Sequence, residues 1–165
     1  MRAVAVDAFG GDEHVSAMLD ALRSSWAWVD ELAFVAELDG EIVGQVLYNR
    51  AILDAPGRLV DVLVLSPLGV RRDLQGAGIG GRLLTESLAT VRRRPEPLVF
   101  LEGIPSLYPK FGFVRASGLG FTSPSVRIPD DAFQVFVLPN YEPSMTGALV
   151  YPDAFWRTDS VGRRD

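Results

Sequence analysis

The chain has 165 residues, of which 48% are hydrophobic, and this is enough for one globular domain with a sizeable core. The absence of cysteine excludes disulfides, thiolate metal sites and a cysteine nucleophile, and a single histidine leaves little for a metal site or a Ser-His triad. The net charge of −5 argues against nucleic-acid binding, and the lack of a long apolar run or signal peptide predicts a soluble cytoplasmic protein without membrane attachment.

The first part of the chain predicts helical segments followed by a β-hairpin. Apolar residues at three- and four-residue spacing indicate an amphipathic helix after Gly10-Gly11. Asp39-Gly40 lies between two apolar runs, which is typical of a tight hairpin turn. The predicted elements are a short apolar segment (residues 1–9), a helix (13–23), two strands (33–38 and 41–48) and a β-branched strand (59–65).

The second part predicts a helix that packs on a sheet, followed by several short strands. The helix is amphipathic and ends before Pro95 and Pro97. We expect a single domain over residues 1–156 and a frayed polar tail over residues 157–165. The predicted elements are a helix (79–91), a strand (98–101), a brief helix (105–111), a strand from residue 113, a polar loop (117–131) and strands over residues 132–138 and 148–151.

The strongest functional signal is the glycine-rich stretch over residues 76–81, directly before the predicted helix 79–91. Glycine lets the backbone approach a ligand closely, and a helix start offers unpaired N–H groups with a partial positive charge. Such a turn favours phosphate binding. Arg71 and Arg72 add positive charge, and residues 70–94 hold six arginines against two carboxylates in an otherwise acidic chain. A polyanionic ligand would be attracted to this basic segment.

Two common nucleotide motifs fit this stretch poorly. Gly76-x-Gly78-x-x-Gly81 formally matches a dinucleotide fingerprint, with Glu102 at about the spacing of a ribose-binding acid. However, charged residues separate the preceding apolar run from the first glycine, whereas a dinucleotide turn follows its strand at once. The Walker pattern fails because no Lys-Ser/Thr follows the glycines. A dinucleotide-binding enzyme therefore stays a distant alternative.

Two other motifs resemble the GNAT superfamily of acetyltransferases. Gln75-x-x-Gly78-x-Gly80 resembles the Gln/Arg-x-x-Gly-x-Gly/Ala signature of that family, and residues 107–113 (LYPKFGF) resemble its aromatic-Tyr-x-x-x-Gly-Phe segment. Residues 65–70 (LSPLGV) and Gly103-x-Pro105 resemble the YhbS-like branch. The resemblance covers residues 34–152.

The resemblance implies an α/β (α+β) fold with a central, mixed and mostly antiparallel sheet flanked by helices. Residues 3–9 then look like the end of the first helix, with the usual first strand missing. An uncovered sheet edge would invite pairing, so we expect a homodimer.

The resemblance also implies a cofactor, acetyl-CoA, bound through its pyrophosphate on the glycine loop and its pantetheine arm on the preceding strand. The expected reaction is transfer of the acetyl group to a primary amine of a small molecule or peptide, without a metal. The positions that the resemblance assigns to acetyl-CoA are Leu68, Val70, Arg71, Arg72, Gln75, Gly76, Ala77, Gly78, Ile79, Gly80 and Gly81.

Tyr108 matches the general acid of the family, because it occupies the tyrosine position of the aromatic segment. A phenol stays protonated at neutral pH and can donate to a leaving thiolate. Glu102 and Asp61 are both candidates for the base, and a water relay is a third option. Ile104 and Leu107 replace an aspartate and an aromatic residue of close relatives, which keeps open an alternative, an acyl-CoA-binding module without turnover.

Overall fold

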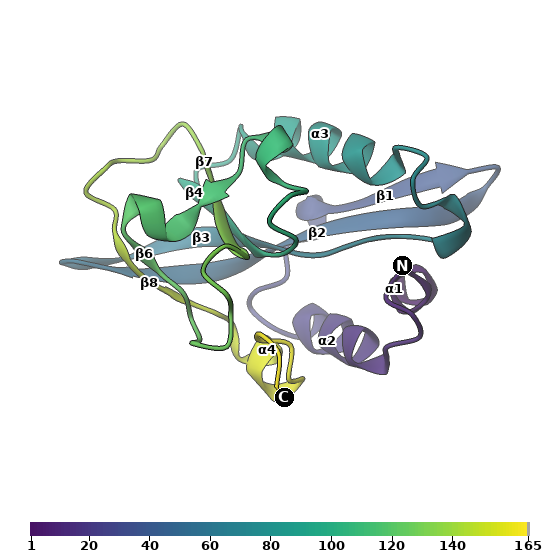
Figure 1. Ribbon diagram of the computed structural model, residues 1–165, viewed down its shortest axis with the longest axis horizontal. Helices are drawn as coiled ribbons and strands as arrows, with labels where there is room; N and C mark the ends of the chain where they lie inside the picture. The colour runs from purple at the N-terminus through teal and green to yellow at the C-terminus, as the bar shows by residue number, and fades with distance from the viewer. Residues whose placement is uncertain (165) are drawn as a thin grey trace.

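The computed structural model describes residues 1–164, which form one curled sheet with helices on both faces (Figure 1). The α-helices are α1 (Arg2–Ala8), α2 (Glu13–Arg23), α3 (Ile79–Val91) and α4 (Asp153–Arg157). The strands are β1 (Ala33–Leu38), β2 (Glu41–Ala55), β3 (Arg58–Val70), β4 (Leu98–Glu102), β5 (Val114–Arg115), β6 (Phe121–Thr122), β7 (Phe133–Val137) and β8 (Gly147–Val150). Short 3-10 turns lie at η1 (Asp30–Leu32), η2 (Arg72–Leu74), η3 (Pro109–Phe111) and η4 (Ala116–Leu119).

The sheet is mixed and mostly antiparallel, as the sequence predicts. Its strand order is β5-β7-β4-β3-β2-β8-β6, and within residues 1–164 only β3–β4 and β6–β8 pair in parallel. The long β2 pairs with β1 along its first half and with β8 along its second half. No strand precedes α1 in the described chain, so the outer edge of β1 has no partner among these residues.

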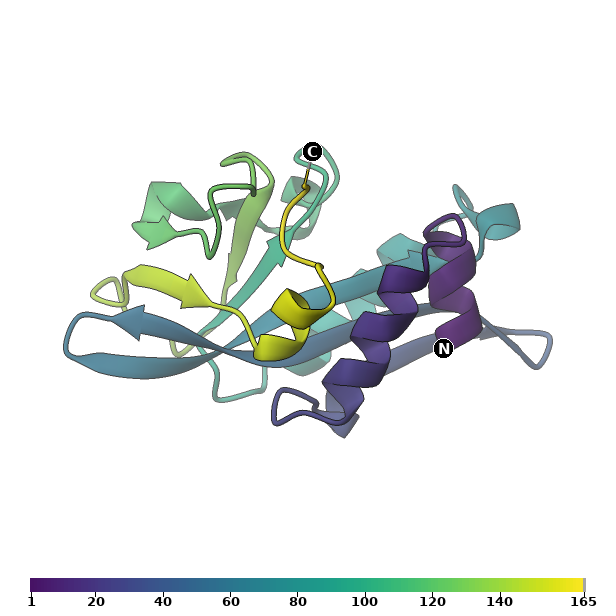
Figure 2. The ribbon, with the colours of Figure 1, turned by 90° about the horizontal axis from the view of Figure 1, so that it is seen from below.

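The helices divide between the two faces of the sheet. α3 covers one face, and α1, α2 and α4 lie on the other (Figures 1 and 2). α3 buries Leu83, Leu84, Leu88 and Val91 against the sheet, which confirms the predicted amphipathic helix. Asp12 immediately precedes α2, and its Oδ1 accepts a hydrogen bond from the backbone N–H of His14 (2.9 Å) and so caps the helix.

The hairpin between β1 and β2 turns at the predicted Asp39-Gly40. Both residues have positive φ, +52° and +79°, as a tight two-residue hairpin requires. β2 continues to Ala55, well beyond the predicted end at residue 48, because Ala51 and Leu53 are buried in the core and the strand pairs with β8 there. The predicted polar loop 117–131 begins with the last three residues of η4 and also contains β6.

The C-terminal part folds back on the domain. After α4 the chain turns, and Val161 is buried with only 1% of its surface exposed. The sequence predicts a frayed tail from residue 157, because the segment is polar.

No helix within residues 1–164 is both long and apolar enough to cross a membrane.

A core substitution tests the packing between β4, β6 and β7. The Phe100 ring is fully buried, lies edge-to-face on Phe121 (5.1 Å between centroids) and stacks on Phe133 (5.6 Å). We expect Phe100→Ala to lower the free energy of unfolding by about 3–5 kcal/mol, because it removes buried area and leaves a cavity. Urea unfolding measures this. Val126→Ala is the control, since Val126 is fully exposed and its loss should change stability by less than about 0.5 kcal/mol.

Candidate active site

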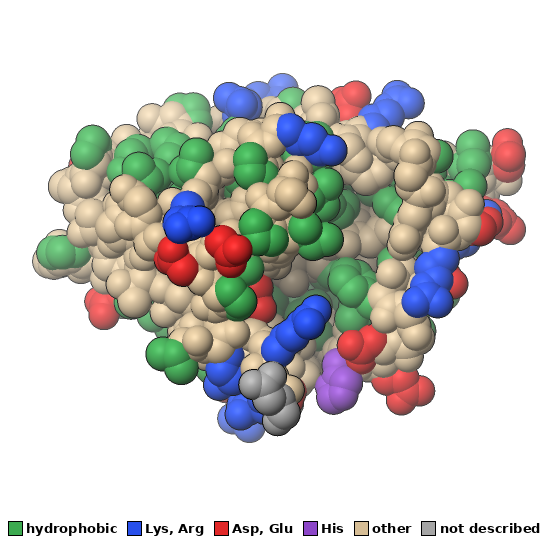
Figure 3. All heavy atoms as spheres, viewed as in Figure 1, with side chains coloured by type: hydrophobic (Ala, Val, Ile, Leu, Met, Phe, Trp, Pro, Cys, Tyr) green, Lys and Arg blue, Asp and Glu red, His purple; other side chains and the backbone are tan. Residues whose placement is uncertain are grey.

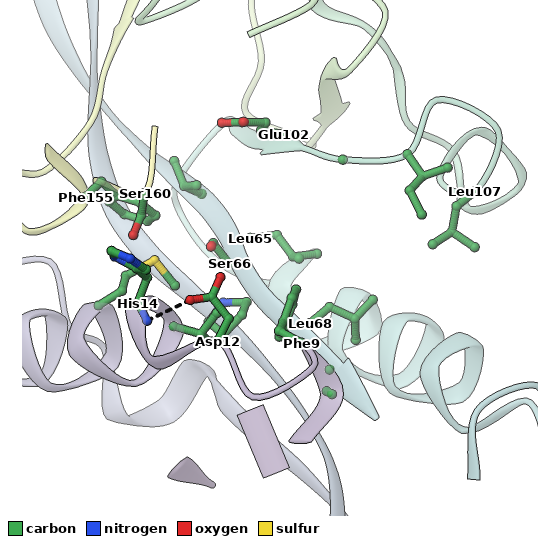
Figure 4. Close-up of a pocket in the computed structure, with 18 of the residues that line it drawn as sticks. Phe9, Asp12, His14, Leu65, Ser66, Leu68, Glu102, Leu107, Phe155 and Ser160 are labelled. Carbon is green, nitrogen blue, oxygen red and sulfur yellow. Dashed lines mark hydrogen bonds between the residues drawn. The ribbon is translucent and has the colours of Figure 1, made fainter. Parts of the chain in front are cut away.

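A cleft of about 590 Å³ lies where β3 and β4 part, on the face that carries α1, α2 and α4. Its walls come from the α1–α2 connection, the end of β3, the residues after β4 and the C-terminal segment. Figure 3 shows the surface hollowed above the single histidine, His14, and Figure 4 shows the lining side chains. The candidate site therefore draws on segments from the whole chain.

The cleft exists because β3 leaves its neighbours. β3 and β4 pair only at Leu63–Val99 and Val64–Phe100, and beyond these positions the strands separate. The register of β3 against β2 also shifts, between the pairs Tyr48–Leu65 and Val46–Leu68. At the shift, the side-chain amide of Asn49 donates to the carbonyl of Ser66 (2.8 Å) in place of a ladder bond. The resemblance places the pantetheine arm on this part of β3.

The two strand positions that the resemblance assigns to acetyl-CoA differ in exposure. Leu68 is half-buried and Val70 is buried at the end of β3, and both line the cleft. The carbonyl of Val70 already accepts a hydrogen bond from Nε2 of Gln75 (3.0 Å). Gln75 therefore fastens the start of the glycine loop to the end of the strand.

The glycine loop leads directly into α3. Gly76 and Gly78 have φ of +84° and +87°, a conformation that side chains with a Cβ rarely adopt. Apart from the adjacent residues of the chain, no atom of residues 1–164 lies within 4 Å of the position that a Cβ would take on either residue, so the loop is open on that side. Gly78 caps α3, and the N–H groups of Ile79, Gly80 and Gly81 in its first turn have no acceptor among residues 1–164. Ala77 is exposed within the same loop.

Arg71 and Arg72 have different surroundings. Nε of Arg71 donates to Asp73 (2.7 Å) and Nη1 to Glu41 (2.9 Å), and these carboxylates raise the pKa of Arg71. Arg71 thus ties the start of β2 to η2. The guanidinium of Arg72 makes no ion pair within the described chain and lies beside Gly10, while its backbone N–H donates to Asp7 (2.8 Å). Of the two guanidinium groups, that of Arg72 is the one without a carboxylate partner in residues 1–164.

Tyr108 lies in the cleft wall immediately before η3, and not within a brief helix as the sequence predicts. Its ring packs edge-to-face on Phe113 (5.7 Å), and burial raises the pKa of its hydroxyl. Gly103 is needed beside it, because a Cβ there would lie 2.5 Å from the tyrosine ring. In residues 1–164 no group hydrogen-bonds to the Tyr108 hydroxyl.

The two candidate bases lie in different places. Glu102 ends β4 and lines the cleft, where it accepts a hydrogen bond from the backbone N–H of Gly162 (3.3 Å). Surrounding protein atoms displace water from its carboxylate, so its pKa is raised. Asp61 lies on β3 opposite Ile52 and is not part of the cleft lining. The structure brings Glu102 and Tyr108 into one cleft and leaves Asp61 outside it.

Sequence reasoning missed one end of the cleft. This end is lined by Asp12 and His14 before and within α2, and by Phe155, Asp159 and Ser160 from the C-terminal part (Figure 4). No local pattern marks these residues, since they meet only through the fold. In the part of the chain that the structure describes, no group of three or more His, Cys, Asp or Glu side chains could hold a metal ion.

Comparisons with known proteins agree with this geometry. The family described as "Acetyltransferase (GNAT) domain" matches residues 3–116. The chain is 30% identical over 132 residues to the uncharacterised N-acetyltransferase YjhQ of Escherichia coli (strain K12), which covers 79% of this chain and 72% of that protein.

Two solved structures are similar along nearly the whole chain. One is the GNAT family N-acetyltransferase YhbS of Escherichia coli in complex with CoA, with a TM-score of 0.84, 26% identity and coverage of 98% of this chain and 87% of that chain. The other is a GNAT family acetyltransferase from Brucella melitensis in complex with acetyl-CoA, with a TM-score of 0.73, 28% identity and coverage of 93% and 88%.

The splayed sheet, the glycine loop and the cleft between them define an acyltransferase class of site. The chain belongs to the GNAT acetyltransferase family. The fold class and the resemblance predicted from the two sequence motifs are thereby confirmed, and the function at the level of this family is acetyl-CoA-dependent N-acetyl transfer.

Proposed function

We propose that this protein transfers the acetyl group of acetyl-CoA to a primary amine by direct attack in the cleft between β3 and β4. The amine nitrogen forms a bond to the thioester carbonyl carbon, and the carbon–sulfur bond breaks. Glu102, directly or through a water molecule, takes the proton that the amine loses, and Tyr108 donates a proton to the departing thiolate. No covalent intermediate with the protein is needed.

One observation carries this proposal. The end of β3 and the glycine loop lie on one stretch of the chain, Glu102 and Tyr108 lie on another, and residues of both stretches line a single cleft. The open loop and the unpaired N–H groups of α3 suit a pyrophosphate, and the free backbone of β3 suits the amide groups of a pantetheine arm. Arg72 supports phosphate binding better than Arg71, whose guanidinium is already paired with two carboxylates.

The surroundings of Tyr108 and Glu102 suit them to opposite roles. Burial raises the pKa of the Tyr108 hydroxyl, which therefore stays protonated and able to donate. Partial loss of surrounding water raises the pKa of Glu102, which makes the ionised carboxylate a stronger base than a fully hydrated glutamate.

The finer predictions on partners stay open to test. The edge of β1 lacks a partner in the described chain, and this supports the predicted homodimer. A cytoplasmic location likewise stays a prediction. The alternative function, acyl-CoA binding without turnover, makes a different prediction from an enzyme, namely acetyl-CoA binding without amine-dependent release of CoA.

Gly78→Ala tests the cofactor loop. A Cβ at φ +87° strains the backbone by about 1–2 kcal/mol and projects into the open side of the loop, so we expect acetyl-CoA affinity to fall at least about tenfold. Isothermal titration calorimetry measures the affinity. Gly57→Ala is the matched control, because Gly57 has φ +84° and equally open surroundings but lies in the β2–β3 turn. Equal affinities of the two variants would contradict the assignment.

Tyr108→Phe tests the acid. The variant keeps the ring and its packing on Phe113 and removes only the proton donor. We expect kcat to fall by about ten- to a thousandfold, within or somewhat below the usual range for a general acid, while the Kd of acetyl-CoA changes little. CoA release measured with a thiol reagent checks kcat. Unchanged turnover, with chemistry rate-limiting, would leave the reaction without its acid.

Glu102→Gln tests the base through the pH profile. A base acts when ionised, so kcat/KM falls as pH drops through the pKa of Glu102, and the raised pKa places this loss at a higher pH than for an exposed glutamate. We expect Glu102→Gln to lower kcat by about a hundredfold or more and to abolish that acidic limb. Asp61→Asn is the control and should keep the wild-type profile. Retention of the limb in Glu102→Gln would transfer the role to another group.

A further inference from the structure

The C-terminal segment after α4 is held in place by several independent contacts. The backbone N–H of Ser160 donates to the carbonyl of Phe155 (2.8 Å), and the hydroxyl of Thr158 donates to the carbonyl of Ala154 (2.7 Å). The side chain of Val161 is buried in the core. These contacts fix the path of residues 158–162 along the cleft, where Ser160 and Gly162 form part of the lining.

Arg127, from the loop between β6 and β7, also holds this segment in place. Its Nη2 donates to the carbonyl of Val161 (2.9 Å). Gly162 packs directly on the same arginine, because a Cβ on Gly162 would lie 2.7 Å from the Cβ of Arg127 and 2.9 Å from its carbonyl carbon. Gly162 also has a positive φ of +62°. Both the close approach and the backbone conformation therefore require glycine at this position.

The same residue contacts the candidate base. The backbone N–H of Gly162 donates to Oε2 of Glu102 (3.3 Å), and no other group in residues 1–164 hydrogen-bonds to this carboxylate. Arg127 attracts the carboxylate through its charge but lies beyond ion-pair distance within this part of the chain. A glutamate at the end of a strand has several rotatable bonds, so a single fixed donor decides where its carboxylate is held.

We propose that residues 160–162 form part of the catalytic site and that Gly162 is a positioning residue, whose backbone N–H holds Glu102 toward the acceptor end of the cleft. This inference rests on the proposed role of Glu102 as base. Val161 and the hydrogen bond of Arg127 hold the segment without touching the carboxylate, so these contacts act through Gly162, and the charge of Arg127 adds a direct attraction to Glu102. Burial of Val161 alone would anchor the chain end, but it would not require a donor at Glu102.

The geometry of the cleft supports a role in catalysis. Figure 4 shows Phe155 and Ser160 close together at one side of the cleft, near His14, with Glu102 at the end of its strand. Gln75 and Gly80 of the glycine loop line one end of the cleft, and the C-terminal segment closes the opposite end. A displaced segment should disturb the amine and its base without disturbing acetyl-CoA.

Gly162→Ala in the full chain tests the inference, with Gly118→Ala as the matched control. The new methyl group meets Arg127 and displaces the segment, whereas Gly118 has open surroundings and no positive φ. We expect Gly162→Ala to lower kcat about ten- to a hundredfold through loss of positioning, while the separately measured Kd of acetyl-CoA changes less than about twofold. Gly118→Ala should match the wild type in both.

Arg127→Met and Arg127→Lys provide a second route if Gly162→Ala is unfolded at the assay temperature. Arg127→Met removes the donor to Val161 and should lower kcat, and Arg127→Lys should restore part of it because lysine keeps a donor and the charge. Wild-type kcat in both Gly162→Ala and Arg127→Met, with Glu102→Gln inactive, would overturn the positioning role alone. An active Glu102→Gln enzyme would overturn the base assignment and this inference with it.

Discussion

The short parallel pairing between β3 and β4 is the constraint on which the rest of the site depends. The strands share only two residue pairs, and their separation leaves backbone groups of β3 without a strand partner on that side. Backbone N–H and C=O groups need hydrogen-bond partners, so the gap must hold either water or a ligand with amide groups. In Figure 2, β4 turns away from the long ribbon of β2 and β3. The residues that line the cleft lie at this divergence. Helix α3 then begins just past the end of β3 and offers its unpaired N–H groups beside the same gap.

The cleft also determines the chemistry of the two groups that we assign to catalysis. Tyr108 and Glu102 lie on the same chain segment, and Gly103 between them is small enough for the tyrosine ring to pack closely. Burial shifts both pKa values upward. The wall of the cleft therefore holds a donor that keeps its proton and a carboxylate with increased affinity for one, a pairing that suits acetyl transfer to an amine.

Local sequence patterns predicted the parts of this structure that local chemistry determines. Asp39-Gly40 turns the first hairpin because both residues tolerate positive φ. The loop before α3 likewise uses glycines with positive φ. Parts determined by distant contacts were predicted less well. The second half of β2 depends on pairing with β8, and β6 pairs with β8 over two residues that lie in an apparent loop of the sequence. Arg71 resembled a phosphate ligand in sequence, but Glu41 neutralises it from thirty residues away.

The two ends of the cleft therefore differ in how the sequence encodes them. The end assigned to acetyl-CoA comes mainly from one continuous stretch, residues 64–80, whose backbone conformation is set by its own glycines and its own bulge. The opposite end is assembled from the start of α2, the end of β4 and the chain after β8, which have no sequence spacing in common. We assign the first ligand to backbone groups, so only substitutions that change the backbone there, such as Gly78→Ala, should matter, whereas side chains line much of the second end. Substitutions at positions such as His14 and Ser160 could thus change the acceptor while the sheet and the cofactor loop stay intact. For this reason a sequence motif identifies the acetyl donor, whereas the acceptor depends on side chains that meet only through the fold.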